Sequence, residues 1–253
     1  MGKLNVIYED DDLLVINKPA GVTVNRSETT KEEETIQDLV QSYLHFQLHQ
    51  EENDSEIDDE EESDFVARCG IVHRIDKETS GVLLIAKNEK SFVELQRQFK
   101  SRIVHKTYIA LAHGRIVPEE GTINVPVGRV PWNRRQFGVV PGGKESVSTY
   151  KVDGYFRTDD KKKEILTLVK VMPLTGRTHQ IRVHLQYIGF PIFADFLYAG
   201  RKTQKNDRKL LGRVFLHAFS ISFTHPSTGN EVSFNAPLPQ ELEKVMDHLI
   251  PIV

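Results

Sequence analysis

The sequence contains little cysteine and no long hydrophobic run. Cys69 is its one cysteine, which excludes an internal disulfide bond. No apolar segment approaches the roughly 20 residues that a membrane-spanning helix needs, and the N-terminus lacks the apolar core of a secretion signal. We therefore expect a cytoplasmic protein without membrane attachment.

The signatures of several enzyme classes are also missing. The chain has no His-Glu-x-x-His pair and no cysteine cluster, so its histidines do not predict a metal site. Ser80 lies in Thr-Ser-Gly and not in the Gly-x-Ser-x-Gly turn of many hydrolases. No dinucleotide-binding fingerprint is present. Metal-dependent hydrolysis and hydride transfer are disfavoured, and we expect no metal.

The net charge is dominated by one acidic segment. Residues 50–64 contain ten acidic side chains and no basic one. Without those ten charges, the formal net charge of −3 becomes +7, so the rest of the chain is moderately basic. A basic surface permits a polyanionic partner. We interpret residues 50–64 as a disordered insertion within a single domain, 1–253, because such a run repels itself; competition with RNA for a basic cleft is the functional alternative.

Strand patterns outnumber helix patterns and mostly follow one another. This order indicates an α+β fold with a largely antiparallel sheet. The predicted strands cover residues 4–8, 13–17, 82–86, 106–113, 122–130, 148–156, 166–172, 215–224 and 231–234. The predicted helices cover residues 35–49, 91–100 and 178–189 and a short segment after Pro239. Thr35 with Asp38 predicts a capped start for the first helix, and Thr178 is the expected cap of the third.

A dense polar run precedes one predicted buried strand. Residues 73–80 read His-Arg-Ile-Asp-Lys-Glu-Thr-Ser, and the apolar residues 82–86 follow. Loops on rigid scaffolds commonly contain the chemistry of an enzyme. Asp76 lies two residues after Arg74, and a neighbouring guanidinium keeps a carboxylate ionised and oriented. Such a carboxylate can be a nucleophile, although a structural ion pair fits the same spacing.

Four motifs are spread along nearly the whole chain. They read Val-Ile-Asn-Lys-Pro-Ala-Gly at 15–21, His-Arg-Ile-Asp-Lys-Glu-Thr-Ser-Gly at 73–81, Lys-Thr-Tyr at 106–108 and Gly-Arg-Thr-His-Gln-Ile-Arg-Val-His at 176–184. In this order they resemble the motifs of the RluA-type pseudouridine synthases. The second resembles the family's His-Arg-Leu-Asp-x-x-Thr-Ser-Gly signature, with Ile75 in place of leucine.

The resemblance implies a fold, a reaction and three catalytic residues. The fold would be a bent, mostly antiparallel mixed sheet with flanking helices and a central active-site cleft. The reaction would isomerise uridine to pseudouridine in RNA, with neither a metal nor an organic cofactor. Asp76 would be the nucleophile, attacking either ribose C1′ or the uracil ring. Tyr108 would stack on the flipped base and assist removal of the proton from C5, and Arg182 would form an ion pair with Asp76. Without the resemblance, a core strand position would explain Tyr108 equally well.

RNA binding is expected to need a basic and polar cleft. Arg74 would help to extrude the target uridine and take its place, as enzymes that act on a base remove it from its stack. Arg134 and Arg135 are further candidates, for which a solvated loop is an equally good interpretation. The other expected RNA contacts are Lys18, Arg177, His73 and Thr79.

Departures from the family pattern concern the RNA target. We expect a catalytic domain without an N-terminal S4 module. Asn25 stands where many members have histidine, and Ala194 and Ala199 interrupt an element resembling Gly-Asp-x-x-Tyr-Gly. Large-subunit ribosomal RNA is the first expected target and transfer RNA the second, for a monomeric enzyme. A non-catalytic RNA-binding factor on the same scaffold is the competing hypothesis.

Overall fold

The computed structural model describes residues 3–27, 33–45, 64–133, 136–159 and 163–252. Within those ranges, no helix is both long and apolar enough to span a bilayer. The strands are β1 Val6–Glu9, β2 Leu13–Lys18, β3 Ser80–Ala86, β4 His105–His113, β5 Glu120–Asn124, β6 Val127–Arg129, β7 Phe137–Val139, β8 Val147–Thr158, β9 Ile165–Pro173, β10 Leu216–Thr224, β11 Glu231–Asn235 and β12 Leu249–Ile252. The helices are α1 Ile36–Leu44, α2 Asp64–Ala67, α3 Glu89–Lys100, α4 Gln180–Tyr187, α5 Arg201–Asp207 and α6 Gln240–Asp247.

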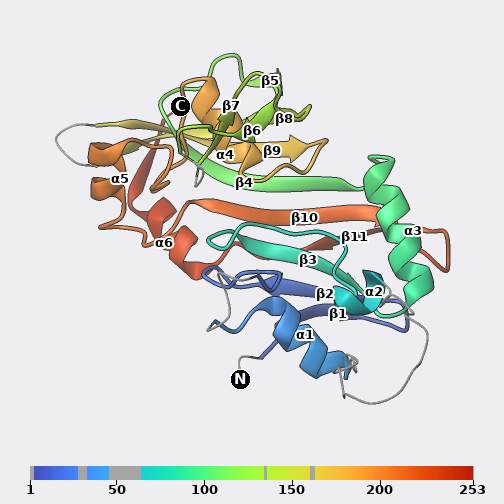
Figure 1. Ribbon diagram of the computed structural model, residues 1–253. Helices are drawn as coiled ribbons and strands as arrows, with labels where there is room; N and C mark the ends of the chain where they lie inside the picture. Colours follow the sequence, from blue (N-terminus) through green and yellow to red (C-terminus); the bar gives the residue numbers. More distant parts are fainter. Residues whose placement is uncertain (1–2, 28–32, 46–63, 134–135, 160–162, 253) are drawn as a thin grey trace.

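One large sheet organises the molecule. Its strands follow the order β1-β2-β3-β10-β4-β9-β8-β12, with β11 also paired to β10 and β5 to β8. The pair β3–β10 is parallel, whereas the other described pairs of this sheet are antiparallel. Strands from the two halves of the chain therefore meet in the middle of the sheet, where β10 lies between β3 and β4 (Figure 1). The predicted α+β fold with a mostly antiparallel mixed sheet is confirmed.

The strands β2 and β3 form a rigid base for the polar run that precedes β3. All seven residues of β3 are buried, which confirms the predicted buried strand. Leu13 and Val15 of β2 pack on the side of α3, and Leu14 and Ile16 pack on the side of α1. Because helices cover both faces, these strands are continuously apolar and do not alternate.

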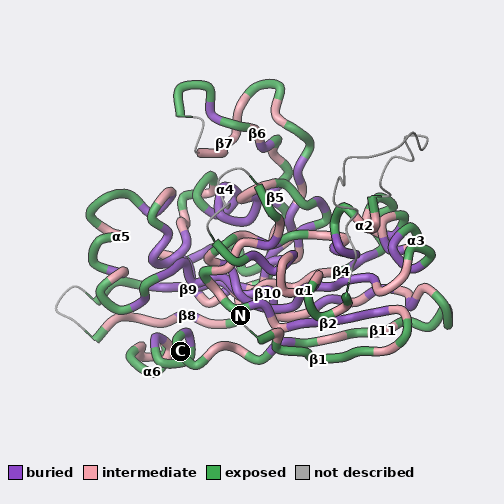
Figure 2. Tube along the Cα trace, turned by 60° about the horizontal axis from the view of Figure 1, so that its bottom comes forward, coloured by how far each residue is buried: buried purple, intermediate pink, exposed green. Residues whose placement is uncertain are grey.

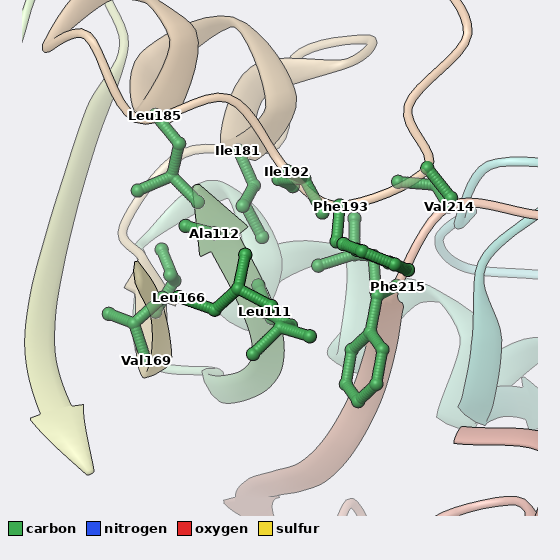
Figure 3. Close-up of a cluster of buried hydrophobic side chains, with 14 of the residues drawn as sticks. Leu111, Ala112, Leu166, Val169, Ile181, Leu185, Ile192, Phe193, Val214 and Phe215 are labelled. Carbon is green, nitrogen blue, oxygen red and sulfur yellow. The ribbon is translucent and has the colours of Figure 1, made fainter. Parts of the chain in front are cut away.

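A second core joins α4 to the other half of the sheet. Figure 3 shows Ile181 and Leu185 of α4 directed toward Leu111 and Ala112 of β4. The two α4 residues are four apart and therefore share one face of the helix. This packing fixes α4 against β4, so polar residues elsewhere on α4 have a defined direction. The ribbon of β6 and β7 projects from one side of the molecule (Figure 2).

The first predicted helix is correct at its start. The Thr35 hydroxyl accepts a hydrogen bond from the Asp38 amide at 3.2 Å, and the Asp38 carboxylate accepts one from the Thr35 amide. The helix ends at Leu44. His45 is the C-cap, with a left-handed φ of 55°, so the predicted continuation of this helix beyond Leu44 is wrong at residue 45; residues 46–49 and most of the predicted acidic insertion at 50–64 lie outside the described residues. Asp64, the last residue of that insertion, begins α2.

Two predictions of element boundaries are wrong. The helix α4 begins at Gln180, and its N-cap is His179 and not Thr178. The side chain of Gln180 instead accepts hydrogen bonds from the Arg177 amide and the Thr175 hydroxyl, which orders the approach to the helix. The predicted strand 122–130 is divided into β5 and β6, and the break contains Pro126, which has no amide hydrogen for a ladder.

Candidate active site

The loop before β3 presents Asp76 to solvent. The Thr79 amide donates to the Asp76 carbonyl at 3.0 Å, which closes a turn around the carboxylate. Directly after it, Gly81 has φ +117°, and a Cβ there would lie 2.1 Å from the carbonyl oxygen of Ala218 on β10. Only glycine permits this close approach of β3 to β10. The Asp76 side chain remains 20% exposed.

The sheet brings the predicted catalytic residues together. Tyr108 on β4 pairs with Ala218 on β10, and Ala218 also pairs with Gly81 on β3. Arg182 reaches the same place from α4. Asp76, Tyr108 and Arg182 all line one cleft of about 520 Å³. Two strand pairings and the packing of α4 thus bring together three residues that are far apart in the sequence.

Arg182 connects the cleft to a buried carboxylate. Its Nε and Nη2 donate to the two Asp195 oxygens at 2.7 and 2.8 Å, and its Nη1 donates to Asp76 Oδ2 at 3.4 Å. Asp195 is fully buried and also accepts from the amides of Leu197 and Tyr198. Although burial opposes the charge, the hydrogen bonds and charge of Asp195 raise the pKa of Arg182. The guanidinium is a fixed cation with one edge directed at Asp76.

Tyr108 is a neutral phenol in this cleft. Burial and the charge of Asp76 raise the pKa of its hydroxyl above the ordinary value of 10.0. A half-buried aromatic ring beside a carboxylate is suited to stacking on a base. The raised pKa disfavours the phenolate form, so the environment favours a stacking platform over a strong base.

Lys18 is buried, so its side chain does not reach a surface where it could contact RNA. Its side chain is 0% exposed, and Nζ donates to the carbonyls of Pro19, Val22 and Lys77 at 2.7, 2.8 and 3.2 Å. Burial lowers the pKa of its ammonium to about 7, with a smaller contribution from Arg213. Because Lys77 follows Asp76, the ammonium secures the backbone of the catalytic loop. Lys18 therefore has a structural role in place of the RNA contact expected from the sequence.

The other predicted RNA contacts line the same cleft but differ in exposure. Arg74 and Arg177 are exposed at its edge. His73 Nε2 accepts a hydrogen bond from the Leu84 amide, and the ring stacks on Phe99. Burial lowers the pKa of His73 to about 3, so the ring is neutral.

Thr79 is almost fully buried in the cleft wall. Its hydroxyl has no hydrogen-bond partner within the described ranges. Arg134 and Arg135 lie outside those ranges.

The charge of the cleft is strongly asymmetric. Among the described residues that line it, Asp76 is the one carboxylate. Such a cleft suits the phosphates of RNA around a single carboxylate. The cationic lining residues are Arg74, Lys100, Arg102, Lys106, Arg177 and Arg182.

One group of side chains within the described ranges has the geometry to hold a metal ion. It consists of Asp10, Asp12 and His225 and lies outside the cleft lining. Asp10 accepts from His225 and from two backbone amides, and Asp12 accepts from Asn88 and Ser91. These hydrogen bonds join neighbouring turns and give the cluster a structural role. The expectation of no metal stays a prediction.

The arrangement agrees with one family along most of the chain. The model of the family described as RNA pseudouridylate synthase matches residues 12–187, a span that includes Asp76, Tyr108 and Arg182. The chain belongs to this family. It is an RNA pseudouridine synthase, an isomerase, as the four motifs predicted.

Similar proteins support the assignment over the full chain. The uncharacterized RNA pseudouridine synthase YlyB of Bacillus subtilis is 37% identical over 246 residues, covering 97% of this chain and 73% of the relative. Ribosomal large subunit pseudouridine synthase D of Neisseria meningitidis is 37% identical over 253 residues, covering 97% of this chain and 61% of the relative. The solved structure of human RNA Pseudouridylate Synthase Domain Containing 1 has a TM-score of 0.72 at 26% identity, covering 99% and 89% of the two chains.

The sequence interpretation of this pseudouridine synthase missed three residues of the site. Asp195 is the principal partner of Arg182, and His179 and Tyr198 lie beside it. The sequence signal for Asp195 and Tyr198 is that they stand at the Asp and Tyr positions of the element resembling Gly-Asp-x-x-Tyr-Gly. The departures at Ala194 and Ala199 hid this agreement. His179 belongs to the motif around Arg182, but spacing gave it no function of its own.

Proposed function

We propose that this pseudouridine synthase converts uridines of large-subunit ribosomal RNA to pseudouridine with Asp76 as the nucleophile. The observation that carries the chemistry is the position of Asp76. Among the described lining residues it is the one carboxylate, and Arg182 fixes one of its oxygens while the side chain stays partly exposed. Relatives named ribosomal large subunit pseudouridine synthase C and D support the RNA target.

Entry of the substrate requires a flipped uridine. The cost of unstacking is a few kcal/mol, and the cationic edge of the cleft offsets it by binding phosphates. Tyr108 packs on the extruded uracil, and Arg74 occupies the place that the base has left. The neutral state of Tyr108 suits this contact, because a phenolate would repel the phosphates and the carboxylate.

The reaction then proceeds by isomerisation at a single ribose. The Asp76 carboxylate attacks C1′ or the uracil ring, and by either route the C1′–N1 bond breaks and its electron pair remains on uracil. The uracil turns, C5 bonds to C1′, and the bond between Asp76 and the substrate breaks, with its electron pair returning to the carboxylate. C5 loses its proton to solvent and N1 gains one, so atoms and electrons balance without an oxidant or a metal. Asp76 leaves unchanged.

The protein would act as a cytoplasmic monomer. One chain supplies every described residue that lines the cleft, including the nucleophile, its arginine and the aromatic platform. No second copy is needed to complete this constellation. The substrate would then be bound by the basic edge of a single molecule.

Release of tritium from RNA labelled at C5 of uridine tests the proposal. We expect release from a large-subunit ribosomal RNA transcript and none from that RNA with Asp76→Asn protein. Equal release by the two proteins would contradict the nucleophile. Release from transfer RNA alone would contradict the proposed target, and binding of RNA without release would indicate a non-catalytic factor.

A further inference from the structure

The ring of His179 is fixed beside the nucleophile. His179 is the N-cap of α4 and has left-handed backbone angles, φ 58° and ψ 18°. Its ring forms edge contacts with Phe137 at 5.6 Å and Tyr198 at 5.8 Å between centroids. It lines the cleft, with 17% of the side chain exposed. The ring is therefore restrained on both sides while one edge faces Asp76.

A hydrogen-bond chain defines which nitrogen of His179 carries the proton. The Phe137 amide donates to the Tyr198 hydroxyl oxygen at 3.2 Å, and that hydroxyl lies 3.0 Å from His179 Nδ1. The amide can only donate, so the phenol oxygen accepts from Phe137; the phenol proton has no other acceptor among the described residues, so the arrangement that uses every donor has that proton donated to Nδ1. A neutral imidazole with Nδ1 as acceptor has its proton on Nε2.

The protonated edge of His179 faces the same Asp76 oxygen as Arg182. His179 Nε2 lies 3.9 Å and Arg182 Nη1 lies 3.4 Å from Asp76 Oδ2. Asp76 Oδ1 has no hydrogen-bond partner within the described residues. The two oxygens of the nucleophile are thus unequal, because both donors approach Oδ2.

We propose that His179 is a positioning residue whose Nε2–H, 3.9 Å from Oδ2 of Asp76 in the free protein, closes to hydrogen-bond distance on that oxygen in the RNA complex and, with Arg182, leaves Oδ1 as the attacking oxygen. Tyr198 sets the required tautomer. This inference rests on the proposed role of Asp76 as nucleophile. Its physical basis is the rotation of a carboxylate about its Cβ–Cγ bond, which two donors on one oxygen restrict. A fixed attacking oxygen increases the fraction of bound substrate in a reactive geometry.

Three substitutions of His179 separate the contributions of its aromatic ring, its N–H donor and its left-handed backbone to the rate. His179→Phe keeps an aromatic ring without a donor, and we expect the single-turnover rate to fall about 10-fold with RNA affinity unchanged. His179→Gln supplies an N–H near the place of Nε2 and should restore part of the rate. His179→Asn suits the left-handed backbone but is too short, so it should remain slow. A fast Asn variant with a slow Gln variant would show a backbone role and overturn the inference.

The tautomer gives a test that does not depend on activity. Long-range ¹H–¹⁵N NMR correlations of the wild-type protein should show His179 with its proton on Nε2. Tyr198→Phe removes the phenolic donor while keeping the ring, so the Nδ1–H form should gain population and the rate should fall. Tyr187→Phe is the matched control on α4, the helix that His179 caps, because Tyr187 is exposed and lies outside the cleft lining; its rate and tautomer should equal wild type.

A double-mutant cycle tests whether His179 and Tyr198 affect the rate through the same interaction. In the His179→Phe protein, adding Tyr198→Phe should slow the reaction no further, since Tyr198 acts through the imidazole. Additive losses would overturn the relay. A proton on Nδ1 in the wild type, or an unchanged rate in folded His179→Phe protein, would overturn this inference alone if Asp76→Asn is inactive. Full activity of Asp76→Asn would instead overturn the proposed function.

Discussion

Arg182 lies closer to Asp195 than to Asp76. The two Arg182–Asp195 contacts measure 2.7 and 2.8 Å, and the contact with Asp76 measures 3.4 Å. The fork of the guanidinium matches the buried carboxylate with two parallel hydrogen bonds. Asp195 therefore determines where Arg182 lies, and Arg182 in turn orients Asp76, the proposed nucleophile, with its remaining edge.

Asp195→Asn should impair both folding and catalysis. The substitution leaves a buried arginine without its carboxylate, and breaking a buried pair costs about 3–5 kcal/mol of unfolding free energy. We expect the single-turnover rate to fall at least about 10-fold, because Arg182 then loses the fixed position from which it orients Asp76. Urea unfolding and rate measurement check this. Asp10→Asn is the control, since Asp10 also accepts several hydrogen bonds but lies outside the cleft lining: it should lose stability and keep its rate.

Lys18→Met should destabilise the catalytic loop. The ammonium serves three backbone carbonyls, among them that of Lys77 beside the nucleophile. Without it the carbonyls of Pro19 and Val22 lose this donor, whereas that of Lys77 still accepts from the Gly21 amide, and we expect the free energy of unfolding in urea to fall by about 1–3 kcal/mol. The reaction should slow as well, because the loop that presents Asp76 loses its restraint. Wild-type stability in this variant would contradict the structural role of Lys18.

The same lysine predicts a pH dependence of stability. Its pKa is about 7 in the folded protein, below the ordinary value of 10.5. Between these values the unfolded chain binds the proton more tightly, so stability rises with pH from about 7 to 10 and this group adds no slope below about 7. Lys18→Met lacks the group and should show a smaller slope in that window. Parallel curves for the two proteins would contradict the lowered pKa.

Tyr108→Phe and Tyr108→Leu test the stacking platform. Phenylalanine keeps the ring and should retain a rate within about 10-fold of wild type, whereas leucine loses stacking worth about 1–3 kcal/mol per base. The comparison is made by single-turnover kinetics at saturating RNA. An equal loss in the two variants would show that the hydroxyl, and not the ring, is essential.

Arg74→Gln should change how RNA binding depends on salt. When Arg74 occupies the place of the flipped base, its charge also neutralises about one neighbouring phosphate, and losing that contact reduces the slope of log K against log salt by about 0.7 for single-stranded RNA. Filter binding over a series of salt concentrations measures that slope. Arg201→Gln removes an exposed charge outside the cleft lining and should leave the slope unchanged. Identical slopes for Arg74→Gln and wild type would remove Arg74 from the RNA-binding surface.

Local patterns identified the rigid parts of this molecule and the loop that bears the nucleophile. The continuous apolar runs of β2 and β3 and the capping pair Thr35–Asp38 follow from short-range chemistry, and the structure has them. The meeting of Arg182 with Asp195 does not follow, because it depends on how the segment after α4 folds back. The burial of Lys18 was also hidden, since lysine is usually exposed and its three carbonyl partners come together only in the tertiary fold.

Pseudouridine mapping in the cells that contain this protein tests the central claim most directly. Total RNA is compared from cells lacking the protein and from the same cells supplied with wild-type or Asp76→Asn protein. We predict that specific pseudouridines of large-subunit ribosomal RNA disappear without the protein, return with the wild type and stay absent with Asp76→Asn at equal protein level. Return of those pseudouridines with Asp76→Asn would contradict the account.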